Sequence, residues 1–140
     1  MIYIDTSVLA AYYCPEPLSG KAQQALAQVN ERAISSLVEL EFVSAIARKV
    51  HTHEMRRADA HRILAAFQSH LEQGVYTRLG VDGAHFAKAR EWLATLVVPL
   101  QTLDALHVAL AAMKGCSLMT VDAALAKACA KVGVTARLIA

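Results

Sequence analysis

The hydrophobic pattern of the chain alternates between two kinds of segment, which predict strands and helices in turn. Short apolar or alternating runs predict strands at residues 1–4, 33–35, 75–79, 117–121 and 134–139. Longer stretches between them predict helices at residues 8–13, 20–29, 37–50, 56–73, 83–96, 102–114 and 122–131. Strands that alternate with long helical stretches imply parallel pairing, with helices on both faces of the sheet. The sequence therefore predicts one α/β domain over residues 1–140.

Breaking and capping residues mark several of these boundaries. The segment Cys14-Pro15-Glu16-Pro17 ends the first helix, because proline cannot continue the helical hydrogen bonding. We expect Ser19 to cap the second helix and Thr102 to cap the sixth. Gly74 and Gly115 stand where the fourth and sixth helices end, as glycine C-caps do.

The composition is that of an ordinary domain rather than of a membrane protein. The 140 residues are 56% hydrophobic, and this length can bury a core without disulfides or structural metals. The longest apolar candidate, residues 93–113, contains Pro99, Asp104 and other polar residues, so it is too broken for the roughly 20 residues of a spanning helix. No basic region precedes an apolar stretch at the N-terminus. We expect a cytoplasmic protein with no membrane partner.

The cysteines and histidines give little support for a zinc site or a disulfide framework. Cys14, Cys116 and Cys129 are widely spaced and form no CxxC pattern, which predicts buried free thiols. Four histidines gather in the middle of the chain, at His51, His53, His61 and His70. The first two are separated by one residue, which splays them on a helix, and no third ligand follows at a fixed spacing.

The net charge of +2 is too small to identify a nucleic-acid-binding protein. The basic residues are nevertheless concentrated in one segment, at Arg48, Lys49, Arg56, Arg57 and Arg62. Such a run is typical of a solvated helical face, but it also suits contact with phosphates or with a partner. The sequence leaves these three interpretations open.

Four acidic residues from distant parts of the chain are expected at one edge of the sheet. Asp5 follows the first strand and Asp122 follows the strand at residues 117–121, so parallel pairing brings both to the same edge. Glu41 lies about one turn into the helix after residues 33–35, and Asp104 lies in the first turn of its helix. The four carboxylates could therefore converge where ligands of parallel α/β sheets bind.

Each of these acids also has a simpler explanation. Asp5 and Asp122 are good N-caps, Asp104 complements a helix dipole, and Glu41 could be a solvated helical residue. However, Asp104 lies in the apolar segment Leu103-Asp104-Ala105-Leu106, and no lysine or arginine lies within a turn of it. Buried acids are rare unless they are paired or bind a metal, so a metal ion is a reasonable partner.

Four ordered motifs resemble the PIN domain family, and specifically its VapC-type toxins of type II toxin–antitoxin systems. The motifs are Ile2-Tyr3-Ile4-Asp5-Thr6-Ser7, then Ser35 with Glu41 and Arg48, then Thr102-Leu103-Asp104-Ala105-Leu106-His107-Val108-Ala109, and finally Thr120-Val121-Asp122-Ala123-Ala124-Leu125. They span nearly the whole chain, and the third is the most specific. The resemblance also favours Glu41 over Glu39, which lies on a different face of the same helix.

This resemblance implies a three-layer α/β/α fold with a mostly parallel central sheet, and an Mg²⁺-dependent endoribonuclease, with Mn²⁺ as an alternative metal. Asp5 and Asp104 are expected to ligate the metal directly, and Asp122 and Glu41 to complete the shell directly or through water. Thr6 and Thr120 are expected to orient the carboxylates or a water, and His107 to be a core or supporting residue. The implied partners are transfer or ribosomal RNA, a cognate antitoxin and a second copy in a homodimer.

Two other functions remain as alternatives. One is a PIN-like fold that serves as a binding scaffold without catalysis, which the presence of all four acids disfavours. The other is a phosphatase or receiver domain that handles phosphate. Such proteins need a second acid beside the first aspartate or a lysine after a later strand, and neither accompanies Asp5 or Thr120.

Overall fold

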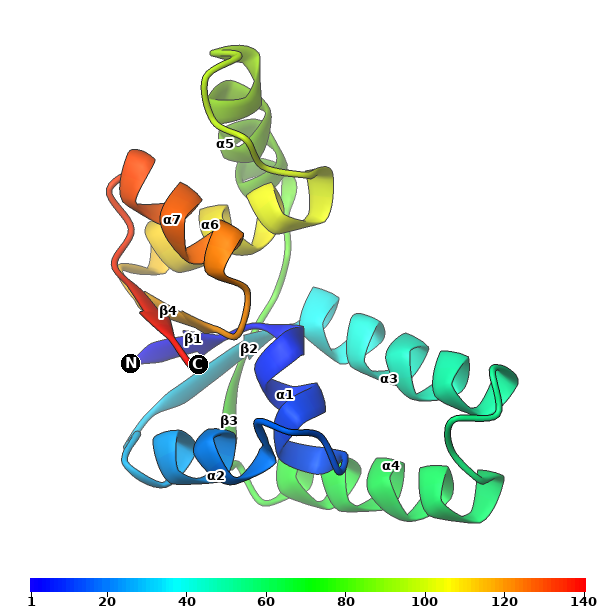
Figure 1. Ribbon diagram of the computed structural model, residues 1–140. Coiled ribbons are helices and arrows are strands. Elements are labelled where there is room, and N and C mark those ends of the chain that lie inside the picture. Colours follow the sequence, from blue (N-terminus) through cyan, green and yellow to red (C-terminus); the bar gives the residue numbers. More distant parts are fainter.

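The computed structural model describes residues 1–140 and contains five strands and seven helices (Figure 1). The strands are β1 (Ile2–Ile4), β2 (Arg32–Ser35), β3 (Tyr76–Leu79), β4 (Ser117–Thr120) and β5 (Ala136–Leu138). The helices are α1 (Thr6–Tyr13), α2 (Ser19–Ala27), α3 (Ser36–His51), α4 (Arg57–Glu72), α5 (Gly83–Ala94), α6 (Thr102–Lys114) and α7 (Ala123–Lys131). The predicted order of elements is confirmed, and no predicted end differs from the observed one by more than two residues.

The five strands form one fully parallel sheet in the order β3-β2-β1-β4-β5. From the central strand β1, the chain first builds outward through β2 and β3, and then returns to place β4 on the other side of β1. The direction of winding therefore reverses between β1 and β4, where Ile4 pairs with Met119. Ligands of parallel α/β sheets bind at such a reversal, beyond the carboxyl ends of the strands.

Helices cover both faces of the sheet, which confirms the three-layer α/β/α architecture. Right-handed crossovers place α1 to α4 on one face, and the reversed winding places α5 to α7 on the other (Figure 1). The strands between the two layers are buried on both sides, and Tyr3 and Ile4 of β1 are completely inaccessible to solvent. Helix α6 is buried from Ala105 to Ala111, so the aspartate in its first turn begins a helix of the core.

Two of the expected helix caps are wrong. Helix α2 has Leu18 at its N-cap, and Ser19 is its first helical residue. The Ser19 hydroxyl instead donates to the carbonyl of Cys14 at 2.7 Å, because the turn around Pro15 brings that carbonyl within reach. Helix α6 likewise has Gln101 at its N-cap, without a side-chain capping bond, and Thr102 is already helical.

The glycine and cysteine predictions are confirmed. Gly74 and Gly115 have φ of +73° and +71°, the left-handed conformation that ends a helix at little cost for glycine. The three cysteines are buried as free thiols. None of the seven helices is both long and apolar enough to span a bilayer.

Candidate active site

Asp5 and Asp122 lie at the winding reversal between β1 and β4. Asp5 directly follows β1, and its backbone N–H donates to the carbonyl of Met119 at 3.1 Å. Its Oδ1 accepts from the backbone N–H of Val8 at 3.2 Å, and Asp122 accepts from that of Ala124 at 2.9 Å. Both aspartates therefore cap helices, as their sequence positions predicted. The caps also fix the two carboxylates at the carboxyl edge of the sheet.

Ser7 and Thr120 connect these two aspartates. The Ser7 hydroxyl donates to Asp5 Oδ1 at 2.5 Å and lies 3.4 Å from Thr120 Oγ1. Thr120 Oγ1 in turn accepts from the backbone N–H of Asp122 at 3.0 Å. Sequence reasoning named Thr120 as a supporting residue but missed Ser7. The signal for Ser7 was its position two residues after a capping aspartate, where a hydroxyl can reach that carboxylate.

Glu41 reaches the same corner from α3. Its Oε1 accepts a hydrogen bond from Thr6 Oγ1 at 2.8 Å, and Nε2 of His107 contacts the same oxygen. Thr6 therefore holds one oxygen of this carboxylate in place. His107 is buried on α6, and sequence reasoning expected only a core or supporting residue there, without naming Glu41 as its partner.

Asp104 shares an electrostatic environment with the other three acids. It lies in the first turn of α6, three residues before His107, so both project from one side of that helix. Burial raises the pKa of Asp104. The positive charge that His107 carries when protonated opposes this shift, and the negative charges of Asp122, Asp5 and Glu41 each raise the pKa further. The four predicted acids are therefore close enough for their charges to interact.

The protein environment acts differently on Asp5 and Glu41. Burial raises the pKa of Asp5, although hydrogen bonds from Ser7, Thr120 and Val8 oppose the shift. Burial also acts to raise the pKa of Glu41, but the hydrogen bond from His107, the charge that His107 carries when protonated, and the hydrogen bond from Thr6 outweigh it and hold the pKa below its usual value. The site thus lowers the pKa of Glu41 while it raises the pKa values of Asp5 and Asp104.

No lysine or arginine forms an ion pair with any of these four carboxylates. Glu39 differs in this respect, because Arg78 of β3 donates to its two carboxylate oxygens at 2.6 and 3.1 Å. The neighbouring acids of α3 therefore have different surroundings, with Glu39 paired at the surface and Glu41 in the acidic corner.

The donor set suits a divalent cation that keeps part of its water shell. No three histidine, cysteine or acidic side chains lie close enough together to hold an ion by themselves. Mg²⁺ commonly uses one or two carboxylates and takes its other ligands from water and substrate phosphate. Carboxylates that repel one another and form no ion pair with lysine or arginine fit such an ion, because it supplies the missing positive charge and accepts hard oxygen ligands.

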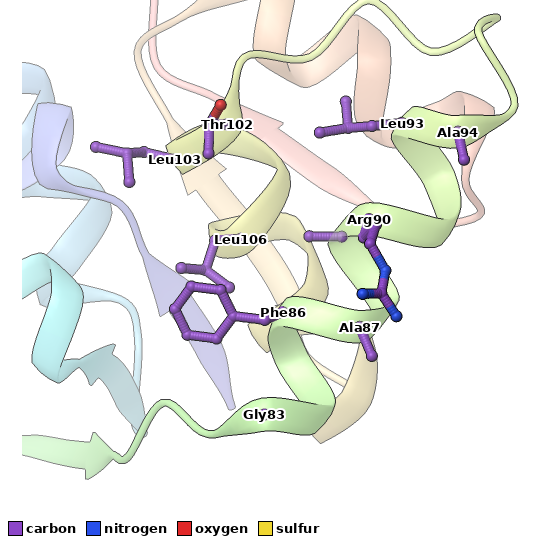
Figure 2. Close-up of a pocket in the computed structure, with 10 residues that line it drawn as sticks. Gly83, Phe86, Ala87, Arg90, Leu93, Ala94, Thr102, Leu103 and Leu106 are labelled. Carbon is purple, nitrogen blue, oxygen red and sulfur yellow. The ribbon is translucent and has the colours of Figure 1, made fainter.

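A groove extends from the acidic corner along α5 and α6. Glu41 and Asp104 line a pocket of about 570 Å³ together with Leu103, which also lines an adjoining apolar groove of about 590 Å³. Figure 2 shows Phe86 of α5 beside Leu106 of α6 in this apolar part, with Leu103 near the start of α6. A ligand that follows the groove would therefore meet apolar side chains first and carboxylates at its end.

The basic segment lies away from this corner, around the connection between α3 and α4 (Figure 1). Lys49 lies 3.4 Å from Glu16, and Asp59 pairs with both Arg56 and Arg62 at 3.3 Å. These ion pairs agree with the interpretation as a solvated surface.

Fold and site together define a parallel α/β domain with an acidic cluster at its winding reversal. Residues 2–131 match the family model of the PIN domain, so the chain belongs to the PIN domain family. This finding confirms the family suggested by the four sequence motifs. No curated protein sequence matches the chain.

Solved structures agree with this assignment at the level of the fold. VapC20 from Mycobacterium tuberculosis, a toxin that cleaves the sarcin–ricin loop, is 21% identical with a TM-score of 0.74, covering 96% of this chain and 97% of VapC20. The FitAcB structure from Neisseria gonorrhoeae is 18% identical with a TM-score of 0.70, covering 97% of this chain and 96% of that chain. VapBC2 from Rickettsia felis, bound to a DNA fragment of its promoter, is 16% identical with a TM-score of 0.70, covering 99% of this chain and 98% of that chain.

Proposed function

We propose that this protein is a divalent-metal-dependent endoribonuclease and the toxin of a toxin–antitoxin pair. The observation that carries the proposal is the cluster of four carboxylates at the winding reversal, which has no lysine or arginine to neutralise it. Membership of the PIN domain family and the likeness to VapC20 support the same activity. The substrate class, transfer or ribosomal RNA, and a homodimer remain predictions from the sequence.

In this proposal, Asp5 and Asp104 bind the metal directly, and Asp122 and Glu41 complete its shell directly or through water. A bound Mg²⁺ or Mn²⁺ supplies a water of lowered pKa and stabilises charge on the phosphoryl oxygens. The protein's own contribution is orientation. Hydrogen bonds hold one oxygen of Glu41 and one of Asp122, which leaves the second oxygen of each for the cation or a water.

Expression in cells tests the proposed activity. The wild-type chain is expected to arrest growth and to produce discrete RNA cuts, whereas Asp104→Asn should do neither, because it removes a proposed metal ligand and its charge. Glu39→Gln is the matched control, since that acid is already paired with Arg78 and should not be needed for cleavage. Growth and mapped RNA ends in the presence and absence of Mg²⁺ give the readout. Equal cutting by wild type and Asp104→Asn would reject the assignment, and absence of cutting by both would favour a binding scaffold.

We also propose an antitoxin segment as the occupant of the groove between α5 and α6. The shape and charge of this groove suit a segment with apolar side chains that ends in a basic group near Glu41 and Asp104. The structural relatives include FitAcB, VapBC2 and a toxin–antitoxin complex from Klebsiella pneumoniae, which supports a protein partner of this kind.

Phe86→Ala is expected to weaken this complex by about tenfold or more, because the 58% exposed ring lines the groove and large aromatic side chains often dominate interface energy. Met113→Ala serves as the control, since Met113 is also a partly exposed apolar residue of α6 but lies outside the groove. The affinity can be measured by calorimetry with the cognate antitoxin. Equal affinities for the two variants would contradict the proposed position.

A further inference from the structure

A series of hydrogen-bonded, buried polar side chains lies directly behind Glu41. The Tyr3 hydroxyl lies 2.8 Å from Ser35 Oγ and 2.7 Å from His107 Nδ1, and His107 Nε2 contacts Glu41 Oε1. Tyr3 and Ser35 are fully buried, and His107 is 3% exposed. Side chains from β1, β2, α6 and α3 thus connect the centre of the core to one carboxylate of the acidic corner.

The capacity of each group to donate fixes the direction of these hydrogen bonds. An ionised Glu41 can only accept, so Nε2 of His107 carries the hydrogen, and Nδ1 of the neutral ring must accept. Tyr3 then donates to Nδ1 and accepts from the hydroxyl of Ser35. The Ser35 oxygen accepts in turn from the backbone N–H of Val38 at 3.2 Å. With a doubly protonated ring the order would reverse, and the Ser35 hydroxyl would have no acceptor. The neutral arrangement gives each of these side-chain hydrogens an acceptor within the series.

This series of hydrogen bonds begins and ends on the same helix. Val38 and Glu41 both belong to α3, and the polar groups between them brace the start of that helix against β1 and α6. At Glu41, Thr6 and His107 bond the same oxygen, Oε1, whereas Oε2 receives no hydrogen bond from the protein. The Glu41 side chain is 26% exposed and lines the pocket with Asp104. The series of buried side chains therefore ends at the candidate active site.

We propose that His107 is a positioning residue that, supported by Tyr3 and Ser35, fixes Glu41 through Oε1 and leaves Oε2 as the oxygen offered to a cation or its bound water. This inference rests on the proposed nuclease function. A residue of this kind acts through the ligand that it orients, as the outer partners of metal ligands do in other proteins. Its removal should therefore change metal affinity only while Glu41 is present.

The decisive experiment is a double-variant cycle read by Mn²⁺ affinity in calorimetry. His107→Leu removes the donor and is expected to lower the affinity by about tenfold. His107→Gln keeps an N–H donor near the position of Nε2 and should restore most of that loss. In a Glu41→Gln background, His107→Leu should have no further effect, because the two residues act as one unit. An equal loss in both backgrounds, or no loss in either, would overturn the proposal.

Tyr3→Phe and NMR of the metal-free protein separate this inference from the proposed function. In the wild type, ¹⁵N spectra of the His107 ring are expected to show the tautomer protonated at Nε2, and both Tyr3→Phe and Glu41→Gln should shift these signals. A ring protonated at Nδ1 alone, or ¹⁵N signals of His107 that do not change in either variant, would overturn the positioning role. If the wild type neither binds Mn²⁺ nor cleaves RNA, the nuclease proposal fails, whereas the NMR result still decides whether His107 holds Glu41. Thermal unfolding in chelator identifies any variant that fails to fold.

Discussion

Asp5→Asn is expected to reduce RNA cleavage by at least about 100-fold, since it removes a proposed direct metal ligand and even outer partners of metal ligands account for about 10- to 100-fold. The fold should survive, because asparagine caps a helix as well as aspartate and can still accept from Val8. Without metal, the variant should be as stable as the wild type or slightly more stable, because it lacks a buried negative charge. Cleavage of a labelled RNA and denaturant unfolding measure the two effects.

Asp82→Asn provides a matched control for this experiment. Asp82 caps α5 by accepting from the backbone N–H of Ala84 at 2.9 Å, so the same substitution alters a helix cap outside the acidic corner. Its cleavage rate should equal that of the wild type. An Asp5→Asn protein that cuts RNA at the wild-type rate would reject Asp5 as a metal ligand.

In chelator, the stability contributed by Asp5 and Asp104 is expected to fall as the pH rises. Burial raises their native pKa values above the usual 3.8, so the native state holds these protons more tightly than the unfolded state. Their contribution is complete below pH 3.8 and is lost as the pH rises through the elevated native values. Glu41 acts in the opposite direction, because its native pKa is below 4.5 and its contribution is lost only as the pH falls through that lowered value.

Mg²⁺ or Mn²⁺ should reduce this loss, because binding to the ionised carboxylates stabilises the native state. The free energy of unfolding can be measured in urea from about pH 4 to about pH 8, with chelator or with Mn²⁺. The largest effect of the metal is expected at the high end of this range. In the double variant Asp5→Asn/Asp104→Asn, the free energy of unfolding should neither fall in this way as the pH rises nor increase when metal is added. A wild-type stability that does not change with Mn²⁺ would contradict the prediction.

Most of the fold could be predicted because buried parallel strands leave continuous apolar runs, and helices between them leave periodic ones. The positions of Asp5 and Asp122 also followed from local patterns, since a strand that ends in a helix cap puts the capping side chain at the edge of the sheet. The misplaced caps at Ser19 and Thr102 are errors of a single residue, because a hydroxyl beside a helix start looks the same in sequence whether it lies at the N-cap or at the first helical position.

The surroundings of the acids were harder to predict, because they depend on contacts between distant residues. Local sequence could not distinguish Glu39 from Glu41, and their surroundings differ because Arg78, on another strand, pairs with Glu39. The contact between Glu41 and His107 joins residues 66 positions apart. The two side chains meet only because α3 and α6, which lie on opposite faces of the sheet, both begin near its carboxyl edge. Hydrophobic periodicity carries no information about such a contact.

Four helices begin around the acidic corner, since α1, α3 and α7 follow strands and α6 runs back toward the start of β4. Each helix start carries roughly half a positive elementary charge from its aligned peptide dipoles. About two positive charges of backbone origin therefore surround four carboxylates, even without a lysine or arginine. The same backbone field that makes the crowded acids tolerable also attracts anions, so this corner can accept a phosphate group once a cation has reduced the charge of the carboxylates.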